Sequence, residues 1–112
     1  MATDWVTWDD ERGRVSFKTV GSAEGLTVGH ARIEPGDRLA EHRHAPSEVY
    51  LVLRGEALVT LAGEPHRLRA GDTLLIPPDA LHACESVGTE PLRFAYVLAA
   101  DAFDDVEYVF ST

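Results

Sequence analysis

Residues 36–55 read GDRLAEHRHAPSEVYLVLRG, and this stretch decides how the rest of the chain is interpreted. It places two histidines one residue apart, His42 and His44, then Glu48 four residues later, and it has a glycine at each end. Side chains on a β-strand alternate between the two faces with a period of two. His42, His44 and Glu48 therefore share a face, provided that any bulge at residues 45–47 preserves the phase.

The strand that follows these histidines separates two kinds of side chain. Glu48, Tyr50 and Val52 fall on one face, and Val49, Leu51 and Leu53 form a purely aliphatic second face. Tyr50 is thus the neighbour of Glu48 and the candidate catalytic residue, either as a general acid or as a hydrogen-bond donor to a bound substrate. The alternative is a residue that lines the interior with its hydroxyl at the rim.

A second stretch, residues 71–82, reads GDTLLIPPDALH and supplies His82. Pro77-Pro78 cannot continue a central strand, so they mark a corner and His82 arrives from a different strand. Three imidazoles and one carboxylate suit a divalent transition metal such as iron, manganese, nickel, copper or zinc. A closed structural zinc site is the weaker alternative, because such sites are rich in cysteine and this chain has one.

The remaining pattern is that of an all-β protein. Short apolar runs alternate with Gly, Pro and Asp at a spacing typical of sandwiches and barrels. The predicted strands are Trp5–Trp8, Arg14–Thr19, Leu26–Glu34, Glu48–Leu53, Glu56–Ala62, Glu64–Leu68, Thr73–Ile76, His82–Val87, Leu92–Ala99 and Val106–Phe110. Asp101–Asp105 is expected to form a solvated turn or one helical turn. Closure into a small barrel or a two-sheet sandwich removes the exposed edges of so many short strands.

Length and charge narrow the possible partners. A chain of 112 residues predicts one domain, residues 1–112. The formal charge of −9 disfavours nucleic acid and anionic membrane surfaces as partners.

A single cysteine excludes an internal disulfide. The start of the chain has no signal-peptide pattern, and no apolar run is long enough to span a bilayer. These features predict a cytoplasmic protein.

The two stretches together resemble the cupin superfamily. Gly36-x5-His42-x-His44-x3-Glu48-x6-Gly55 is similar to its first signature, and Gly71-x5-Pro77-x-Asp79-x2-His82-x3-Ser86 is similar to its second. The resemblance implies an antiparallel β-barrel of jelly-roll type, in which His42, His44, Glu48 and His82 hold one metal ion. Two positions depart from the family pattern, which bears on turn shape and local hydrogen bonding. Asp79 stands where the family usually has glycine, and Ser86 where it usually has asparagine.

Four protein ligands on an octahedral ion leave two positions for a small chelating substrate, or for a substrate and dioxygen. We therefore expect a metal-dependent enzyme, with dioxygenase chemistry first. A lyase, decarboxylase or isomerase would use the same ligands, with Tyr50 or a metal-bound hydroxide moving the proton. A cupin module that binds a small ligand without turnover is the alternative of another class.

Several residues outside the metal set receive plainer interpretations. His66 is expected at the surface, and His30 facing solvent or a pocket. Cys84 is expected to be a small buried apolar residue rather than a redox-sensitive thiol. Phe94, Tyr96 and Leu98 are predicted to wall the cavity. The family tendency and spare apolar residues near both termini predict a homodimer; these are Trp5, Val6 and Trp8, with Val106, Tyr108 and Phe110.

Overall fold

The computed structural model describes residues 4–111, so the first three residues and the last one of the predicted domain lie outside it. Residues 4–111 form strands and one short 3₁₀ helix, η1 (Phe103–Asp105). A solvated turn or one helical turn was expected at Asp101–Asp105. The strands are β1 (Val6–Asp10), β2 (Gly13–Ala23), β3 (Leu26–Ile33), β4 (Arg38–Arg43), β5 (Glu48–Arg54), β6 (Glu56–Leu61), β7 (Glu64–Arg69), β8 (Thr73–Ile76), β9 (His82–Ser86), β10 (Leu92–Leu98) and β11 (Val109–Phe110).

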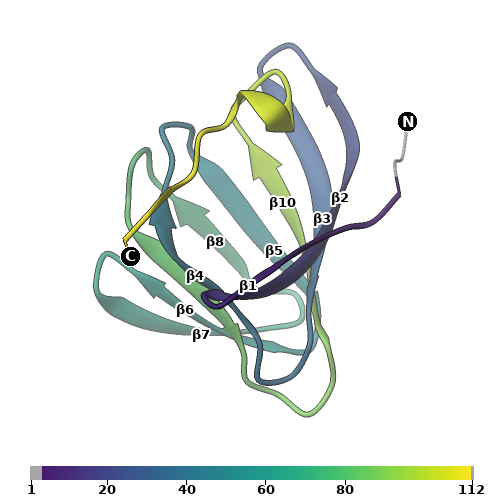
Figure 1. The fold of residues 1–112 in the computed structure, drawn as a ribbon, viewed down its shortest axis with the longest axis vertical. Helices are drawn as coiled ribbons and strands as arrows, with labels where there is room; N and C mark the ends of the chain where they lie inside the picture. The colour runs from purple at the N-terminus through teal and green to yellow at the C-terminus, as the bar shows by residue number, and fades with distance from the viewer. Residues whose placement is uncertain (1–3, 112) are drawn as a thin grey trace.

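The strands form two antiparallel sheets that enclose the interior (Figure 1). One sheet has six strands in the order β1-β2-β3-β10-β5-β8, and the other has five in the order β11-β4-β9-β6-β7. Strands distant in sequence, such as β3 and β10, become neighbours. This arrangement confirms the predicted jelly-roll class, built as two facing sheets.

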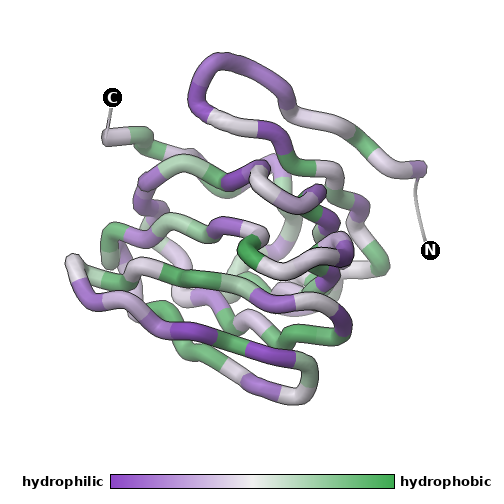
Figure 2. The backbone as a smooth tube through the Cα atoms, turned by 90° about the horizontal axis from the view of Figure 1, so that it is seen from below, coloured by the Kyte–Doolittle hydropathy of each residue, from purple (hydrophilic) through white to green (hydrophobic). Residues whose placement is uncertain are grey.

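Alternation along each strand decides what lies inside. In β5, Glu48, Tyr50 and Val52 are buried, whereas Leu51 and Leu53 are exposed. β10 and β3 alternate in the same way, and the hydropathy of the backbone changes from residue to residue along the strands (Figure 2). The predicted division of β5 into two faces is therefore confirmed, and the face that carries Glu48 and Tyr50 is the inner one.

Two tight turns of the fold contain residues with positive φ. Ala62 and Gly63 join β6 to β7 and both have positive φ, 49° and 83°, which is the conformation of a two-residue type I′ hairpin turn. Asp79, which replaces the glycine of the family pattern, also takes a positive φ of 59°. Asp tolerates this region better than most residues. The backbone amide of Asp79 donates to the carbonyl of His44 at 2.9 Å, so the substitution leaves the turn joined to the histidine segment.

Two strand predictions were wrong. Arg38–Arg43 was not among the predicted strands, yet it forms β4. Its sequence, RLAEHR, has few apolar residues, so hydrophobic alternation does not indicate a strand there. Hydrogen-bonded pairing with β9 on one side and β11 on the other holds this segment in the extended conformation. At the other end, only Val109–Phe110 of the predicted strand Val106–Phe110 pairs in a sheet.

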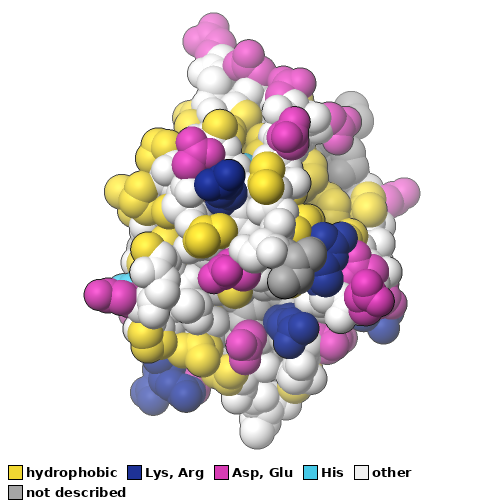
Figure 3. Space-filling model, turned by 60° about the vertical axis from the view of Figure 1, so that its left-hand side comes forward, with side chains coloured by type: hydrophobic (Ala, Val, Ile, Leu, Met, Phe, Trp, Pro, Cys, Tyr) yellow, Lys and Arg dark blue, Asp and Glu magenta, His cyan; other side chains and the backbone are white. Residues whose placement is uncertain are grey.

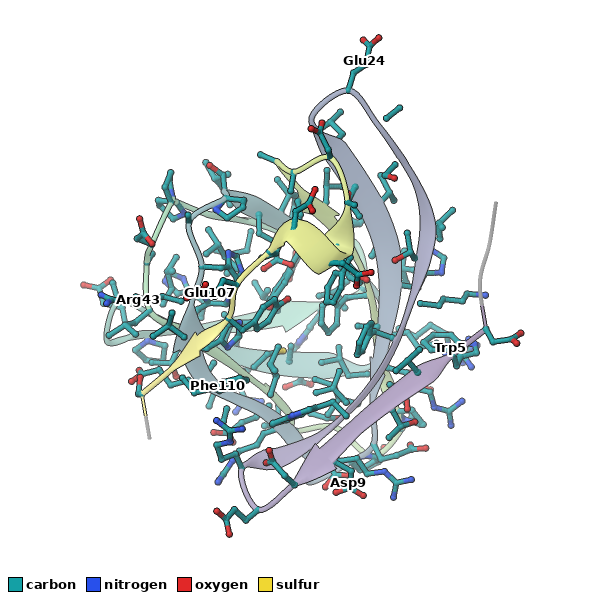
Figure 4. The ribbon with its side chains drawn as sticks, turned by 45° about the horizontal axis from the view of Figure 1, so that its top comes forward. Trp5, Asp9, Glu24, Arg43, Glu107 and Phe110 are labelled. Carbon is teal, nitrogen blue, oxygen red and sulfur yellow. The ribbon has the colours of Figure 1, made fainter. Side chains whose placement is uncertain are left out.

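Strands β1 and β11, near the two ends of the chain, contact each other through one aromatic pair. After β10 the C-terminal segment passes through η1 and reaches β4, where Phe110 pairs with His42 (Figures 1 and 4). β1 lies at the edge of the larger sheet, and its Trp8 stacks on Phe110 with ring centroids 5.5 Å apart. Segments outside the predicted motifs therefore contribute to the interior.

The surface is mainly acidic, as the net charge of −9 requires. Figure 3 shows carboxylate side chains scattered over one side of the molecule. Among the described residues, none of the helical structure is long and apolar enough to cross a membrane.

We predict that two glycines with similar φ differ in their tolerance of alanine. At Gly55 (φ 80°) a Cβ would lie 2.7 Å from the carbonyl oxygen of Pro91, whereas at Gly63 (φ 83°) it would meet nothing within 4 Å. Gly63→Ala should lower the free energy of unfolding by about 1–2 kcal/mol, through backbone strain alone. Gly55→Ala should add overpacking and lose about 2–4 kcal/mol. Urea unfolding measures both, and equal losses would contradict the prediction.

Candidate metal centre

Three strands deliver four donor groups to one point between the sheets. His42 lies on β4, His44 directly after it, Glu48 at the start of β5, and His82 at the start of β9. One ring nitrogen from each of the three histidines lies within 4.8 Å of the others. The pairing of His42 with His82 across the β4–β9 ladder explains how residues forty positions apart come together.

Backbone carbonyls fix the orientation of all three rings. The Nδ1 of His42 lies 2.7 Å from the carbonyl oxygen of Ala40, and that of His82 lies 2.9 Å from the carbonyl oxygen of Ala80. The Nδ1 of His44 lies 2.9 Å from the carbonyl oxygen of Pro46. A carbonyl oxygen only accepts, so each Nδ1 donates and each neutral ring presents an Nε2 lone pair to the centre. This tautomer is the one that metal-binding histidines commonly show.

The Nε2 atoms and Glu48 form a compact donor set. The Oε1 of Glu48 lies 3.1 Å from Nε2 of His44 and 3.5 Å from Nε2 of His82. Nε2 of His42 and Nε2 of His82 are fully buried and have no hydrogen-bond partner among the described residues. Buried nitrogens without partners are rare in proteins and call for an explanation. Three inward lone pairs and one carboxylate fit a divalent transition metal.

Burial and mutual contact shift the pKa values at the centre. Burial and the neighbouring imidazoles lower the pKa of His42 to about 4. Burial also disfavours protonation of His44, but its contact with Glu48 outweighs this and raises its pKa. Burial opposes ionisation of Glu48, and its close contacts with His44 and His82 still lower its pKa. The carboxylate is therefore ionised at neutral pH, as a metal ligand must be.

A cavity of about 230 Å³ opens beside these groups. Its wall is aromatic and aliphatic and consists of Trp8, Val15, Phe17, Ala31, Leu39, Glu48, Tyr50, Phe94, Tyr96, Phe103, Tyr108 and Phe110. None of these lining residues carries a positive charge. Glu48 is the single carboxylate among these lining residues, and the other polar side chains are three tyrosines and Trp8. The cavity therefore suits a small ligand with substantial apolar surface.

Three tyrosines line this cavity, two of them in ring contact with the histidines. The ring of Tyr108 stacks on His42 with centroids 4.7 Å apart, and the ring of Tyr50 meets His82 edge-on at 6.2 Å. Burial, then the charge of Glu48, raises the pKa of Tyr50 and of Tyr108 well above the ordinary value. Burial raises the pKa of Tyr96 to about 12. All three hydroxyls therefore hold their protons at neutral pH.

Comparison with known proteins gives the chain a family. The family model described as "Cupin domain" matches residues 29–99, well over half of the sequence. The chain belongs to the cupin family. This cupin is also similar in fold to Rru_A2000 from Rhodospirillum rubrum, with a TM-score of 0.85, 18% identity, and coverage of 97% of this chain and 75% of that one.

Relatives of this cupin act in different reactions. Dimethylsulfoniopropionate lyase DddW of Ruegeria pomeroyi is 41% identical over 108 residues, which are 92% of this chain and 70% of the relative. Polyketide synthase CurC of Streptomyces cyaneus is 40% identical over 80% of this chain and 58% of its own length. A gentisate 1,2-dioxygenase of Ralstonia sp. is 31% identical over 69% of this chain but only 22% of its own length. This chain therefore spans less than two thirds of the length of two of these three relatives.

The structure brings together all four residues that sequence analysis predicted as ligands, with Tyr50 beside them. Of the three predicted wall residues, Phe94 and Tyr96 line the cavity, whereas Leu98 is buried in the core behind it. Cys84 is also in the core, and burial raises its thiol pKa. His30 and His66 lie outside the centre, each half-buried on a strand.

Sequence reasoning missed part of the cavity wall. Trp8, Tyr108 and Phe110 were interpreted as spare apolar residues at a subunit contact, but all three line the cavity. The segments that carry them lie outside the two motifs, and the alternation of aromatic residues at 108 and 110 was the one available signal. Phe110 is held by Trp8 on one side and by the guanidinium of Arg12, 4.1 Å from its ring centroid.

We predict that His42→Ala and Glu48→Gln each remove most of the bound metal. Each variant should also melt at a lower temperature than the metal-loaded protein, because a ligand of the native state alone stabilises that state, by about 2.7 kcal/mol at a hundred times its Kd. Elemental analysis and thermal melts measure both effects. His66→Ala, on β7 away from the centre, is the control. Unchanged metal content in both ligand variants would exclude this centre.

We predict that His42 in the metal-free protein titrates near pH 4, followed by the NMR signals of its ring. Its folded pKa lies below the ordinary value of 6.5, so the unfolded chain takes up this proton first. The free energy of unfolding should therefore fall as the pH drops from about 6.5 to about 4. His44, with its raised pKa, contributes stability that is lost as the pH rises. His42→Gln should reduce the fall in the free energy of unfolding between about pH 6.5 and about pH 4. An unchanged pH dependence of this free energy would refute the assignment of the low pKa to His42.

Proposed function

We propose that this cupin is a metal-dependent lyase that eliminates a neutral leaving group from a small carboxylate bearing an onium group. The supporting observation is a cavity walled by aromatic rings and one carboxylate directly beside a buried three-histidine centre. The relative DddW, whose name states dimethylsulfoniopropionate as substrate, is 41% identical over nearly the whole chain. A β-sulfonio carboxylate is therefore the first candidate substrate.

The proposed metal ligands are His42, His44, Glu48 and His82. A divalent transition metal held there would act as a Lewis acid on the substrate carboxylate and offset the negative charge of Glu48, which now opposes ionisation of nearby tyrosines. The metal itself is not specified, because the same donor set accepts iron, manganese, nickel, copper or zinc.

The cavity wall suits the cationic end of such a substrate. A sulfonium or quaternary ammonium group is attracted by the faces of aromatic rings, more strongly when both are shielded from water. Phe17 and Phe103 lie in ring contact at 4.9 Å, and Phe103 also contacts Tyr96 and Tyr108. No lining residue is positively charged, so nothing in the wall repels the cation. The substrate carboxylate then has to be bound at the metal centre.

Tyr50 is the proposed proton-transfer residue. This residue lines the cavity, two residues after Glu48 on the inner face of β5. Removal of a proton from the carbon next to the carboxylate leaves an electron pair that forms the new C=C bond. The C–S bond breaks, and the dialkyl sulfide departs with the bonding pair. Tyr50 would receive this proton as its phenolate. A cation held by the four ligands would offset the charge of Glu48, lower the pKa of the Tyr50 hydroxyl and let it lose its own proton before the reaction.

The second candidate is dioxygenase chemistry, which the four-ligand set favours because it leaves two positions on an octahedral ion. The match to gentisate 1,2-dioxygenase supports the same idea at lower coverage. An oxygen electrode separates the two reactions. Consumption of oxygen with an aromatic diol, and no volatile sulfide from the sulfonio substrate, would favour the dioxygenase. Saturable binding of either compound without turnover would favour a binding module.

We predict that the metal-loaded protein releases dimethyl sulfide from dimethylsulfoniopropionate equally under air and under nitrogen, as measured by gas chromatography. Tyr50→Phe should lower kcat by about 10²–10⁴-fold, because it removes the proton-transfer group. Its metal content should equal that of the unsubstituted protein, which distinguishes lost chemistry from a lost centre. Full activity of Tyr50→Phe would remove this residue from the mechanism.

We also predict that the charge of the onium group contributes to binding. 4-Methylpentanoate has the shape of dimethylsulfoniopropionate but carries a neutral carbon in place of the sulfonium sulfur. It should inhibit with an affinity at least about tenfold weaker, since a shielded cation–π contact contributes about 2 kcal/mol. Phe103→Leu should reduce the difference in affinity between the charged and the neutral compound. Equal affinities of the charged and neutral compounds would contradict recognition of the cation by the rings.

A further inference from the structure

A row of directly paired residues crosses the inner face of the larger sheet. Thr19 on β2 pairs with Gly29 on β3. Tyr96 on β10 pairs with Gly29 on one side and with Tyr50 on the other. Gly29 has no side chain, so it leaves a gap in this row between Thr19 and Tyr96.

The ring of Tyr96 fills the gap at Gly29. A Cβ at Gly29 would lie 2.2 Å from Cζ and 2.3 Å from Oη of Tyr96, well inside van der Waals contact. The far end of the phenol therefore occupies the place of a side chain at residue 29, and its hydroxyl reaches the side chain of Thr19. Gly29 is not one of the glycines with positive φ, so space and not backbone conformation explains why glycine stands here.

This ring leans away from the strand that carries Glu48. In the larger sheet, β10 lies between β3 and β5. Glu48 and Tyr50 are on β5, whereas the phenol of Tyr96 extends over β3. Tyr96 contacts the ring of Phe103 at 6.0 Å, and Phe103 contacts the ring of Phe17 at 4.9 Å. These three rings therefore close the part of the cavity that lies across β10 from Glu48.

Strand β3 places two small residues in succession on its inner face, Gly29 and Ala31. Ala31 lines the cavity, so the space above it is open. The space above Gly29 is taken by the ring of Tyr96. Without that ring, the open space would continue along β3 from Ala31 to Gly29. Tyr96 therefore decides where the cavity ends along this strand.

We propose that Tyr96, seated on Gly29, sets the maximum length of the substrate. This inference deepens the proposed lyase function and rests on it for binding of the substrate carboxylate at the metal centre. An acid held there would extend into the cavity above Ala31, where the ring of Tyr96 leaves room for a short chain with small alkyl groups. Longer acids would collide with the ring. The substrate class is therefore that of short carboxylates with a compact group at the far end.

Neutral alcohols measure the length limit without the metal or the reaction. Calorimetry on the metal-free protein with 1-alkanols from propanol to octanol should show an affinity that rises about fourfold per methylene up to a limit. In Tyr96→Leu the limit should move to a longer alcohol by about two carbons, because each added methylene is buried in the space opened above Gly29. The same limit in both proteins, or no binding to either, would overturn the inference.

Three further variants separate the ring from other causes. Tyr96→Phe keeps the ring on Gly29 and removes the hydroxyl, so its limit should match that of the unsubstituted chain. Val97→Ala, the next residue on β10 with the opposite phase, controls for destabilisation of the strand and should also keep the limit. Gly29→Ala should push the ring into the cavity and shorten the limit. Its Cβ would also lie 2.7 Å from the carbonyl oxygen of Lys18, so Tyr96→Leu decides the question if this variant does not fold.

Two sulfonio acids test the inference and the proposed function separately. The metal-loaded protein should prefer dimethylsulfoniopropionate to diethylsulfoniopropionate. Tyr96→Leu should shift the ratio of their kcat/KM values toward the diethyl compound by at least about tenfold, as expected for extra methylenes in an apolar pocket. An unchanged ratio in an active protein would overturn the role of Tyr96. No turnover of either compound, together with a shifted alcohol limit in Tyr96→Leu, would reject the lyase and leave the length limit in place.

Discussion

Three backbone carbonyl groups aim the histidine rings, and the chemistry of this protein depends on that constraint. The carbonyls of Ala40, Pro46 and Ala80 each accept a hydrogen bond from an Nδ1, which leaves three Nε2 lone pairs directed at one point. These bonds are local, within two residues of each ring, so they form as soon as the strands are in place. The donor set is consequently arranged before any cation binds, and little reorganisation opposes binding.

Burial of the carboxylate and the imidazoles of this centre costs free energy, because these polar groups are removed from water. Glu48 is 3% exposed and His42 and His82 are fully buried, among side chains such as Ile76 and Leu98 that offer no hydrogen bonds. A buried carboxylate without partners would take up a proton, but contact with His44 and His82 keeps its pKa low. Nε2 of His42 and Nε2 of His82 have no hydrogen-bond partner among the described residues, and a metal ion is the occupant whose chemistry satisfies all of these groups at once.

Much of this centre could be predicted from the sequence because its geometry is local. The period of two fixed the shared face of His42, His44 and Glu48, and Pro77-Pro78 fixed the arrival of His82 from another strand. The strand β4 could not be predicted, because its order comes from pairing with β9 and not from an apolar pattern. Tyr108 and Phe110 were misplaced for a related reason: only the tertiary path of the C-terminal segment shows that they return to the cavity.

Strand β5 shows how one short segment serves two surfaces. By hydrophobicity alone, the face of Val49, Leu51 and Leu53 would be assigned to the core, and the face of Glu48 and Tyr50 to solvent. The fold has the reverse arrangement, because the carboxylate must lie with the histidines between the sheets. Once the polar face is committed to the interior, the aliphatic face has to lie outside, where burial requires a second layer. The inverted polarity of β5 therefore follows from the buried donor set, which leaves Leu51 and Leu53 on the outer face of the sheet, 38% and 41% exposed.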